Sequence, residues 1–88
     1  MLLALDAGNT NITIGAFHGS KLTGRWRLST VHEQTADEWG ILFRNIFSLA
    51  GLKLDDVDGI IVASVVPPLE ASLAEMASRY FRTAAVVV

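Results

Sequence analysis

The chain has 88 residues, enough for one small domain or for a piece of a larger one. Hydrophobic residues make up 51% and charged residues 18% of it, a composition that excludes intrinsic disorder. The formal net charge of −2 favours neither nucleic acid nor an anionic membrane, so we expect neither as a partner. The absence of cysteine, of a membrane-length apolar run and of a signal-peptide pattern excludes a disulfide-built secreted fold and predicts a cytoplasmic location.

Three strands are predicted first. The apolar run 2–5 predicts a buried strand, 12–17 a second strand, and 18–21 the hairpin turn that follows it. Residues 22–28 alternate between apolar or small and polar side chains, which predicts a half-buried third strand in an antiparallel meander. The alternation places one set of side chains on the inner face and the arginines toward solvent or a partner: Leu22, Gly24, Trp26 and Leu28 inside, Arg25 and Arg27 outside.

After a polar connection, 29–34, the pattern becomes helical. Thr35 and Glu38 have capping-box spacing, and Gly51 stands where a glycine commonly ends a helix. Between them we predict an amphipathic helix of about four turns. Its buried face is expected to consist of Trp39, Leu42, Phe43, Ile46, Leu49 and Ala50.

A connection, 52–58, leads to a run of β-branched and apolar residues, 59–66, that predicts a central parallel strand covered on both faces. Two prolines, Pro67 and Pro68, predict the first turn of a second helix. The buried stripe of that helix is expected to be Leu69, Leu73, Met76, Ala77 and Tyr80, with Arg79 and Arg82 in the last turn. Residues 84–88 predict a fifth strand, and because an apolar strand pattern rarely ends a natural chain, we expect a truncated one.

The predicted order is β-β-β-α-β-α-β, which we interpret as an α/β fold with one mixed five-stranded sheet flanked by helices. The fourth and fifth strands follow helical crossovers and therefore run parallel to the first. Ligands of open α/β sheets bind at the carboxyl ends of such strands, where both Asp6 and Ser64 fall.

The stretch 6–11, Asp-Ala-Gly-Asn-Thr-Asn, has the residue types that handle a metal-bound phosphate. Asp6 supplies a hard oxygen for Mg²⁺, and Gly8 lets backbone approach a ligand closely. Asn9 tolerates left-handed turn conformations, Thr10 offers a hydroxyl, and consecutive turn amides can bind an anion. The alternative is a β-hairpin in which these residues serve only as turn formers.

Other chemistry-bearing residues have structural interpretations. His18 and His32 fall in polar connections without a second ligand at metal spacing, so we interpret them as exposed loop residues. Asp55, Asp56 and Asp58 lack the length and glycine of a calcium loop and predict a solvated acidic turn. Ser64 has no predicted histidine partner for acyl transfer. Both tryptophans, Trp26 and Trp39, lie at core spacing and are interpreted as packing residues.

Four blocks carry a resemblance to a known family. They are 6–11 with Gly15 behind it, 26–28 (Trp-Arg-Leu), 35–38 (Thr-Ala-Asp-Glu) and 64–68 (Ser-Val-Val-Pro-Pro). In this order and spacing they resemble the N-terminal part of the type III pantothenate kinases, over all 88 residues. The resemblance implies the ribonuclease H-like fold that actin and sugar kinases share. Residues 1–88 would then form the N-terminal, phosphate-binding half of the first lobe of a two-lobe kinase.

The resemblance also implies an activity. The family phosphorylates pantothenate from ATP, the first step of coenzyme A biosynthesis, with Mg²⁺ and a monovalent cation, K⁺ or NH₄⁺, and as a homodimer. Its first motif holds the nucleotide phosphates and the divalent metal, which implies that Asp6 contacts the metal. The phosphate-binding residues carried over are Asp6, Ala7, Gly8, Asn9, Thr10, Asn11, Ile12 and Thr13.

Two departures from the family pattern stand out. Trp39 replaces the usual tyrosine, which we interpret as core packing. The Gly-x-Asp-Arg segment that supplies the family's catalytic base is absent, so we expect the base and the second lobe after Val88 and predict that this chain alone is inactive. The alternative function is a non-catalytic ribonuclease H-like regulatory or interaction module.

Overall fold

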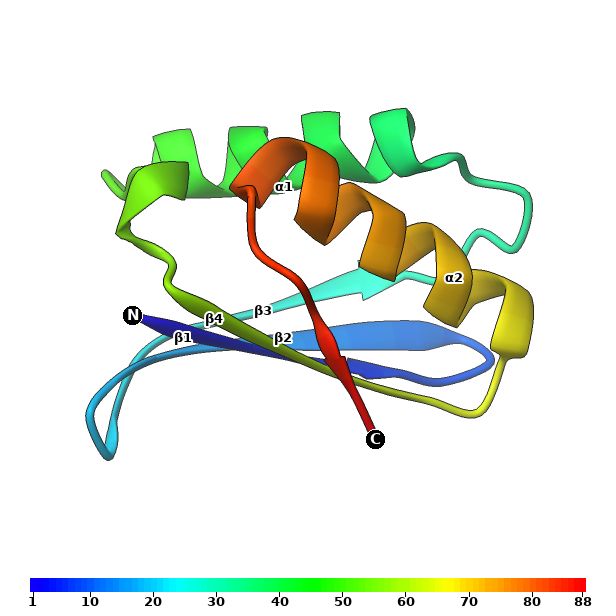
Figure 1. Ribbon diagram of the computed structural model, residues 1–88, viewed down its shortest axis with the longest axis horizontal. Helices are drawn as coiled ribbons and strands as arrows, with labels where there is room; N and C mark the ends of the chain where they lie inside the picture. The colour runs from blue at the N-terminus through cyan, green and yellow to red at the C-terminus, as the bar shows by residue number, and fades with distance from the viewer.

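The computed structural model describes residues 1–88 as one five-stranded sheet with two helices above it (Figure 1). The strand order is β3-β2-β1-β4-β5, with β1, β2 and β3 antiparallel and with β4 parallel to both β1 and β5. This confirms the predicted mixed sheet. The element bounds are β1 (Leu2–Ala7), β2 (Asn11–His18), β3 (Lys21–Ser29), α1 (Ala36–Leu49), a 3₁₀ turn (Leu54–Asp56), β4 (Gly59–Ser64), α2 (Pro67–Met76), a π-helical turn (Ala77–Phe81) and β5 (Val86–Val87).

The two later strands are shorter than predicted. β4 ends at Ser64 rather than at residue 66, because the chain bends at Val65 to enter α2, which starts at Pro67. β5 contains only Val86 and Val87, since the chain between the π-helical turn and Val86 pairs with no strand. Neither change alters the topology, because both strands keep their parallel pairing.

Local signals set the ends of α1. The Thr35 side chain accepts the Glu38 amide while the Glu38 carboxylate accepts the Thr35 amide, which confirms the capping box. At the other end, Gly51 has a φ of 72°, and the Leu52 amide donates to the Phe47 carbonyl at 2.8 Å. This is the left-handed glycine cap that the sequence predicts.

The buried face of α1 differs from the prediction at its C-terminal end. Trp39 and Phe43 are fully buried, and Leu42 and Ile46 are partly buried, as expected. Leu49, however, is 91% exposed and Ala50 is also exposed, whereas Phe47 is 1% exposed. Residues 39, 43 and 47 follow one another at four-residue steps down the same face of the helix, and residue 49 lies about 200° around from residue 47.

The second helix ends in a π-helical turn rather than a regular last turn. The wider turn adds a residue to the helical repeat, so Phe81 is buried where continued α-helical spacing predicts Tyr80. Arg82 follows in a left-handed conformation with a φ of 55°, so it caps the turn and is not part of the last helical turn. The prediction for Leu69, Leu73, Met76 and Ala77 is confirmed.

Tyr80 is only partly buried, and it joins the two helices. Its ring covers Gly40, where a Cβ would lie 2.5 Å from the ring, and its hydroxyl donates to the Asp37 carboxylate. Arg79 also donates to Asp37, at 2.7 Å. The hydrogen bonds from Tyr80 and then Arg79 lower the pKa of Asp37, and the bond to Asp37 raises the pKa values of both Tyr80 and Arg79.

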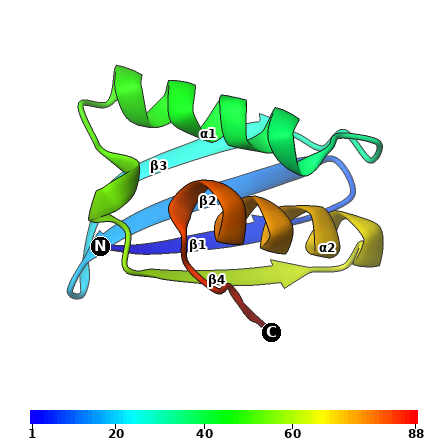
Figure 2. The ribbon, with the colours of Figure 1, turned by 45° about the horizontal axis from the view of Figure 1, so that its top comes forward.

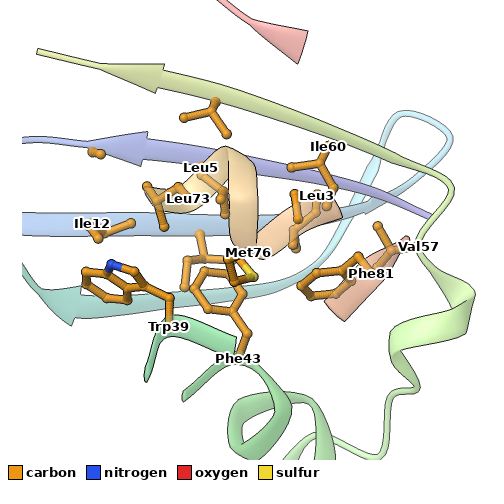
Figure 3. Close-up of a cluster of buried hydrophobic side chains, with 14 of the residues drawn as sticks. Leu3, Leu5, Ile12, Trp39, Phe43, Val57, Ile60, Leu73, Met76 and Phe81 are labelled. Carbon is orange, nitrogen blue, oxygen red and sulfur yellow. The ribbon is translucent and has the colours of Figure 1, made fainter. Parts of the chain in front are cut away.

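The core lies between the helices and one face of the sheet (Figure 3). Side chains from both helices, including Trp39 and Leu73, meet strand residues such as Leu5 and Ile12. Trp39 is 0% exposed, with its indole N–H unpaired, and Trp26 packs on Phe47 at a ring distance of 6.2 Å. Both tryptophans are therefore packing residues, as predicted.

No element covers the other face of the sheet (Figures 1 and 2). The expectation that β4 is covered on both faces is therefore wrong: Ile60 and Val62 are buried, but Ile61 and Ala63 are only partly buried. Leu22 also lies on this face, against the prediction. A β-bulge pairs Phe17 with Leu22 but Ala16 with Gly24, which makes Thr23 an extra residue and reverses the alternation before it. No helix of the structure has the length and apolarity needed to cross a membrane.

Candidate functional site

Three loops meet at the end of the sheet where β1 and β4 finish. They are the β1–β2 loop (8–10), the connection from β3 to α1 (30–35) and the turn from β4 to α2 (65–66). The parallel register pairs Ala7 with Ser64, so the first and third of these loops start side by side. The predicted position of Asp6 and Ser64 at the carboxyl ends of neighbouring strands is confirmed.

The connection from β3 holds the carbonyl groups of the β1–β2 loop. The Thr30 hydroxyl donates to the Gly8 carbonyl at 2.8 Å, and the Thr30 amide donates to the Thr10 carbonyl at 2.9 Å. Nε2 of His32 lies 3.3 Å from the carbonyl oxygen of Asn9, the loop residue between Gly8 and Thr10. All three loop carbonyls therefore have a partner in the segment that follows β3.

The amide groups of the same loop are arranged differently. The Gly8 amide donates to the Asn11 carbonyl at 2.9 Å, but the amides of Asn9 and Thr10 have no acceptor in the chain. Both residues are exposed. Two consecutive free N–H groups beside occupied carbonyls favour an anionic ligand over a cationic one.

The β1–β2 loop does not use the left-handed conformation that Asn9 tolerates. Neither Gly8 nor Asn9 has a positive φ, a conformation found only at Gly19, Gly51 and Arg82. A Cβ at Gly8 would lie 3.4 Å from the Asn11 carbonyl, an ordinary contact. Neither the backbone conformation nor packing within the chain therefore requires a glycine at this position.

Asp6 lies on the uncovered face of the sheet. Its backbone pairs with Thr13 on β2 and with Ala63 on β4, and its carboxylate is exposed and accepts no hydrogen bond from the chain. A free carboxylate beside a hydroxyl residue can bind a hard cation such as Mg²⁺, which needs only one or two carboxylates when phosphate oxygens complete its shell. The donor set fits a metal that arrives with a nucleotide. The chain has no group of three or more His, Cys, Asp or Glu that could hold a metal.

A cavity of about 420 Å³ lies beside Asp6 on this face. Thr13 and Arg25 contribute polar groups to its wall, while most of the lining is apolar and includes Phe17, Leu22 and Ile61. Arg27 pairs across from Thr13 and is exposed on the same face. The two arginines that the sequence places toward solvent or a partner therefore share a face with Asp6.

The remaining predicted site residues fall into two groups. The side chains of Ala7 and Ile12 are buried in the core on the helical face, so only their backbones can serve a ligand. Asn11 is exposed, and its side-chain Nδ2 donates to the Thr10 hydroxyl at 3.2 Å. Thr10 and the free amides thus lie in the loop, Asn11 begins β2 next to them, and Asp6 and Thr13 lie beside the loop on the sheet.

Ser64 orders the turn into α2. Its hydroxyl accepts the Val66 amide and lies 3.0 Å from the Val66 carbonyl. Both of these contacts are with Val66, and no histidine is bonded to the Ser64 hydroxyl. Ser64 pairs with Ala7, the last residue of β1, and therefore lies next to the start of the β1–β2 loop.

Away from this end, the acidic turn has a structural contact. Asp58 forms an ion pair with the Met1 ammonium group at 3.1 Å, and the Asp56 carbonyl accepts from the same group at 2.9 Å. His18 is exposed at the end of β2. His32 is exposed as predicted, but its contact with Asn9 was not foreseen.

Comparison with known sequences assigns the family. A family model described as type III pantothenate kinase matches residues 2–88. The chain belongs to the type III pantothenate kinase family. A type III pantothenate kinase of Solibacter usitatus is 68% identical over 88 residues, and one of Anaeromyxobacter dehalogenans is 51% identical over 81 residues.

The chain spans about a third of these relatives. The alignment with the Solibacter usitatus protein covers 100% of this chain and 34% of that protein. The alignment with the Anaeromyxobacter dehalogenans protein covers 92% of this chain and 32% of that protein. The family assignment therefore concerns the part of these kinases that contains the β1–β2 loop.

Solved structures agree on the fold. A putative N-acetylglucosamine kinase from Porphyromonas gingivalis covers 99% of the chain with a TM-score of 0.71 at 20% identity, and the match takes 34% of that protein. YeaZ from Pseudomonas aeruginosa covers 99% with a TM-score of 0.54 at 17% identity, which takes 43% of that protein. The predicted ribonuclease H-like fold, present as part of a longer chain in these proteins, is confirmed.

Thr30 and His32 are the residues of this region that sequence reasoning missed. They lie 22 and 23 positions along the chain from the carbonyls that they contact. A polar connection without periodicity carries no signal for such contacts. The adjoining capping box was the only local hint, since it fixes where the connection must end.

Proposed function

We propose that the full-length product of this reading frame phosphorylates pantothenate from ATP to give 4'-phosphopantothenate, the first step of coenzyme A biosynthesis. The observation that carries the proposal is the β1–β2 loop: its carbonyls are occupied, and its Asn9 and Thr10 amides are free. A kinase family whose matching segment contains this loop needs such donors for the phosphates of ATP. The same proposal includes the cytoplasmic location expected from the sequence.

Within this proposal, residues 1–88 are the phosphate-binding half of the first lobe. The free amides of Asn9 and Thr10 would donate to phosphate oxygens, and the Thr10 hydroxyl would add a further donor. Asp6 would hold Mg²⁺, which neutralises phosphate charge when bound. We assign no residue of this chain to the catalytic base or to the monovalent cation, K⁺ or NH₄⁺, that the family uses.

Turnover by the full-length protein tests the function. We expect ADP formation that depends on pantothenate, with phosphopantothenate as the second product, measured by a coupled assay and by mass spectrometry. Reactions without pantothenate provide the control for background ATP hydrolysis, and residues 1–88 alone should give no ADP above a no-protein control. A full-length protein that is folded and binds MgADP but forms no pantothenate-dependent ADP would favour the non-catalytic module instead.

The uncovered sheet face leads to a prediction about assembly. Leu2 and Leu22 are 37% and 48% exposed, and Phe17 and Ile61 are only partly covered on this face. Apolar surface of this kind is normally covered by further chain or by a partner subunit. In the complete chain, later segments and a partner subunit would supply this cover, and the family resemblance implies a homodimer, so we expect the full-length protein to be a homodimer. Residues 1–88 alone should associate non-specifically or be marginally stable.

Light scattering on both proteins checks this expectation. The full-length protein should elute with twice its chain mass, and residues 1–88 should be polydisperse. If residues 1–88 form a monodisperse monomer that melts cooperatively, the apolar sheet face needs no cover, and the argument from exposure is wrong.

A further inference from the structure

We propose that Thr30 and His32 are positioning residues that orient the β1–β2 loop for nucleotide phosphate. The inference rests on the function proposed above and extends it to two residues outside the phosphate-binding motif. Their atoms do not need to touch the nucleotide. They act on the peptide groups that would.

The geometry of the peptide unit supplies the argument. In a planar trans peptide the C=O of one residue and the N–H of the next point in opposite directions, and the chain contains no cis peptide. A donor that holds the Gly8 carbonyl therefore turns the Asn9 amide away from the connection. A contact at the Asn9 carbonyl does the same for the Thr10 amide.

The observed contacts match this scheme at successive peptides. The Thr30 hydroxyl donates to the Gly8 carbonyl at 2.8 Å, which orients the Asn9 amide, and His32 lies 3.3 Å from the Asn9 carbonyl, which orients the Thr10 amide. The Thr30 amide donates to the Thr10 carbonyl at 2.9 Å and anchors the end of the loop. The two amides that are turned away, those of Asn9 and Thr10, are the ones without an acceptor. Contacts from segment 30–32 thus leave two adjacent amide donors, those of Asn9 and Thr10, on the open side of the loop.

The contacts also lower the cost of binding. A loop of three residues between two strands could rotate its peptides and present carbonyl oxygens, which repel phosphate. Hydrogen bonds made before the nucleotide arrives remove that freedom, so less ordering is left for the binding step. Loss of one such bond should therefore weaken nucleotide binding more than it weakens the fold.

The test compares four variants of the full-length protein. Thr30→Val keeps the shape and removes the hydroxyl donor, and Thr30→Ser restores it. Thr23→Val is the matched control, because the Thr23 hydroxyl makes the same kind of bond, to the Ala16 carbonyl at 3.1 Å, at the opposite end of the β2–β3 pair. His32→Ala removes an exposed side chain that the fold does not need.

We expect Thr30→Val to raise the KM for ATP and the Kd for MgADP about five- to tenfold, the effect of one hydrogen bond. The KM for pantothenate should stay unchanged. Thr30→Ser should return the KM for ATP and the Kd for MgADP to within about twofold of the wild-type values. His32→Ala should raise both about two- to threefold above wild type. Thr23→Val should lower the Tm about as much as Thr30→Val and leave nucleotide binding unchanged.

Three results would overturn the proposal. The first is a Thr30→Val protein that binds MgADP as tightly as Thr23→Val does. The second is an equal rise in the KM values for ATP and pantothenate, and the third is a serine variant that fails to recover. If Thr30→Val does not fold, unchanged MgADP binding by His32→Ala rejects the proposal. Binding of MgADP measured by calorimetry requires no turnover. A wild-type protein without pantothenate-dependent ADP formation would therefore refute the proposed function, while the effect of Thr30 and His32 on MgADP binding could still be tested.

Discussion

Asp6→Asn in the full-length protein should lower kcat/KM for the kinase reaction by a factor of about 100 to 1,000, or about 3–4 kcal/mol of transition-state stabilisation. The substitution keeps the shape of the side chain and removes its charge. Because phosphoryl transfer depends on a correctly held metal and on charge neutralisation, loss of the Asp6 carboxylate, which we propose holds the metal, should be severe. The fold should be unaffected, since the Asp6 side chain is exposed and has no partner in the chain.

The measurement is steady-state kinetics over a range of Mg²⁺ concentrations, with Tm as the check on folding. Asp55→Asn is the matched control: it also removes one exposed carboxylate without a hydrogen bond or ion pair, and it lies in the 3₁₀ turn away from the loop. The control should keep wild-type kinetics. Near-normal turnover of Asp6→Asn at ordinary Mg²⁺ would show that another group holds the metal.

Phe47→Ala should lower the free energy of unfolding by about 3–5 kcal/mol, the usual cost of removing a buried phenylalanine side chain. Phe47 is 1% exposed and contacts two other aromatic rings, Trp26 at 6.2 Å and Phe81 at 5.5 Å. The truncation therefore opens a cavity that three separate elements would have to fill. Urea unfolding of the full-length protein measures the loss.

Leu49→Ala is the control that makes this prediction sharp. Both residues are large and apolar and lie two positions apart in α1, but Leu49 is 91% exposed. Its truncation should change the free energy of unfolding by no more than about 0.5 kcal/mol. The helical pattern in the sequence predicts the opposite ranking, so a larger loss for Leu49→Ala would mean that the face assigned to α1 is wrong.

The sequence by itself determined most of the architecture. Strand and helix order followed from hydrophobic periodicity, and the start and end of α1 followed from Thr35, Glu38 and Gly51. These signals are local, because a cap or a proline acts on backbone groups within one turn of its own position. The β1–β2 loop was likewise recognisable from adjacent residues, and the family from blocks that include it.

Only the tertiary structure decided which side chains share a face where the regular repeat is interrupted. The bulge at Thr23 moved Leu22 to the face of Asp6, and the π-helical turn exchanged Tyr80 for Phe81 in the core. Each interruption adds one residue to a repeat, and its position depends on the element that packs opposite. The contacts of Thr30 and His32 with the loop have the same origin, since segments more than 20 residues apart meet only after β2 and β3 have paired.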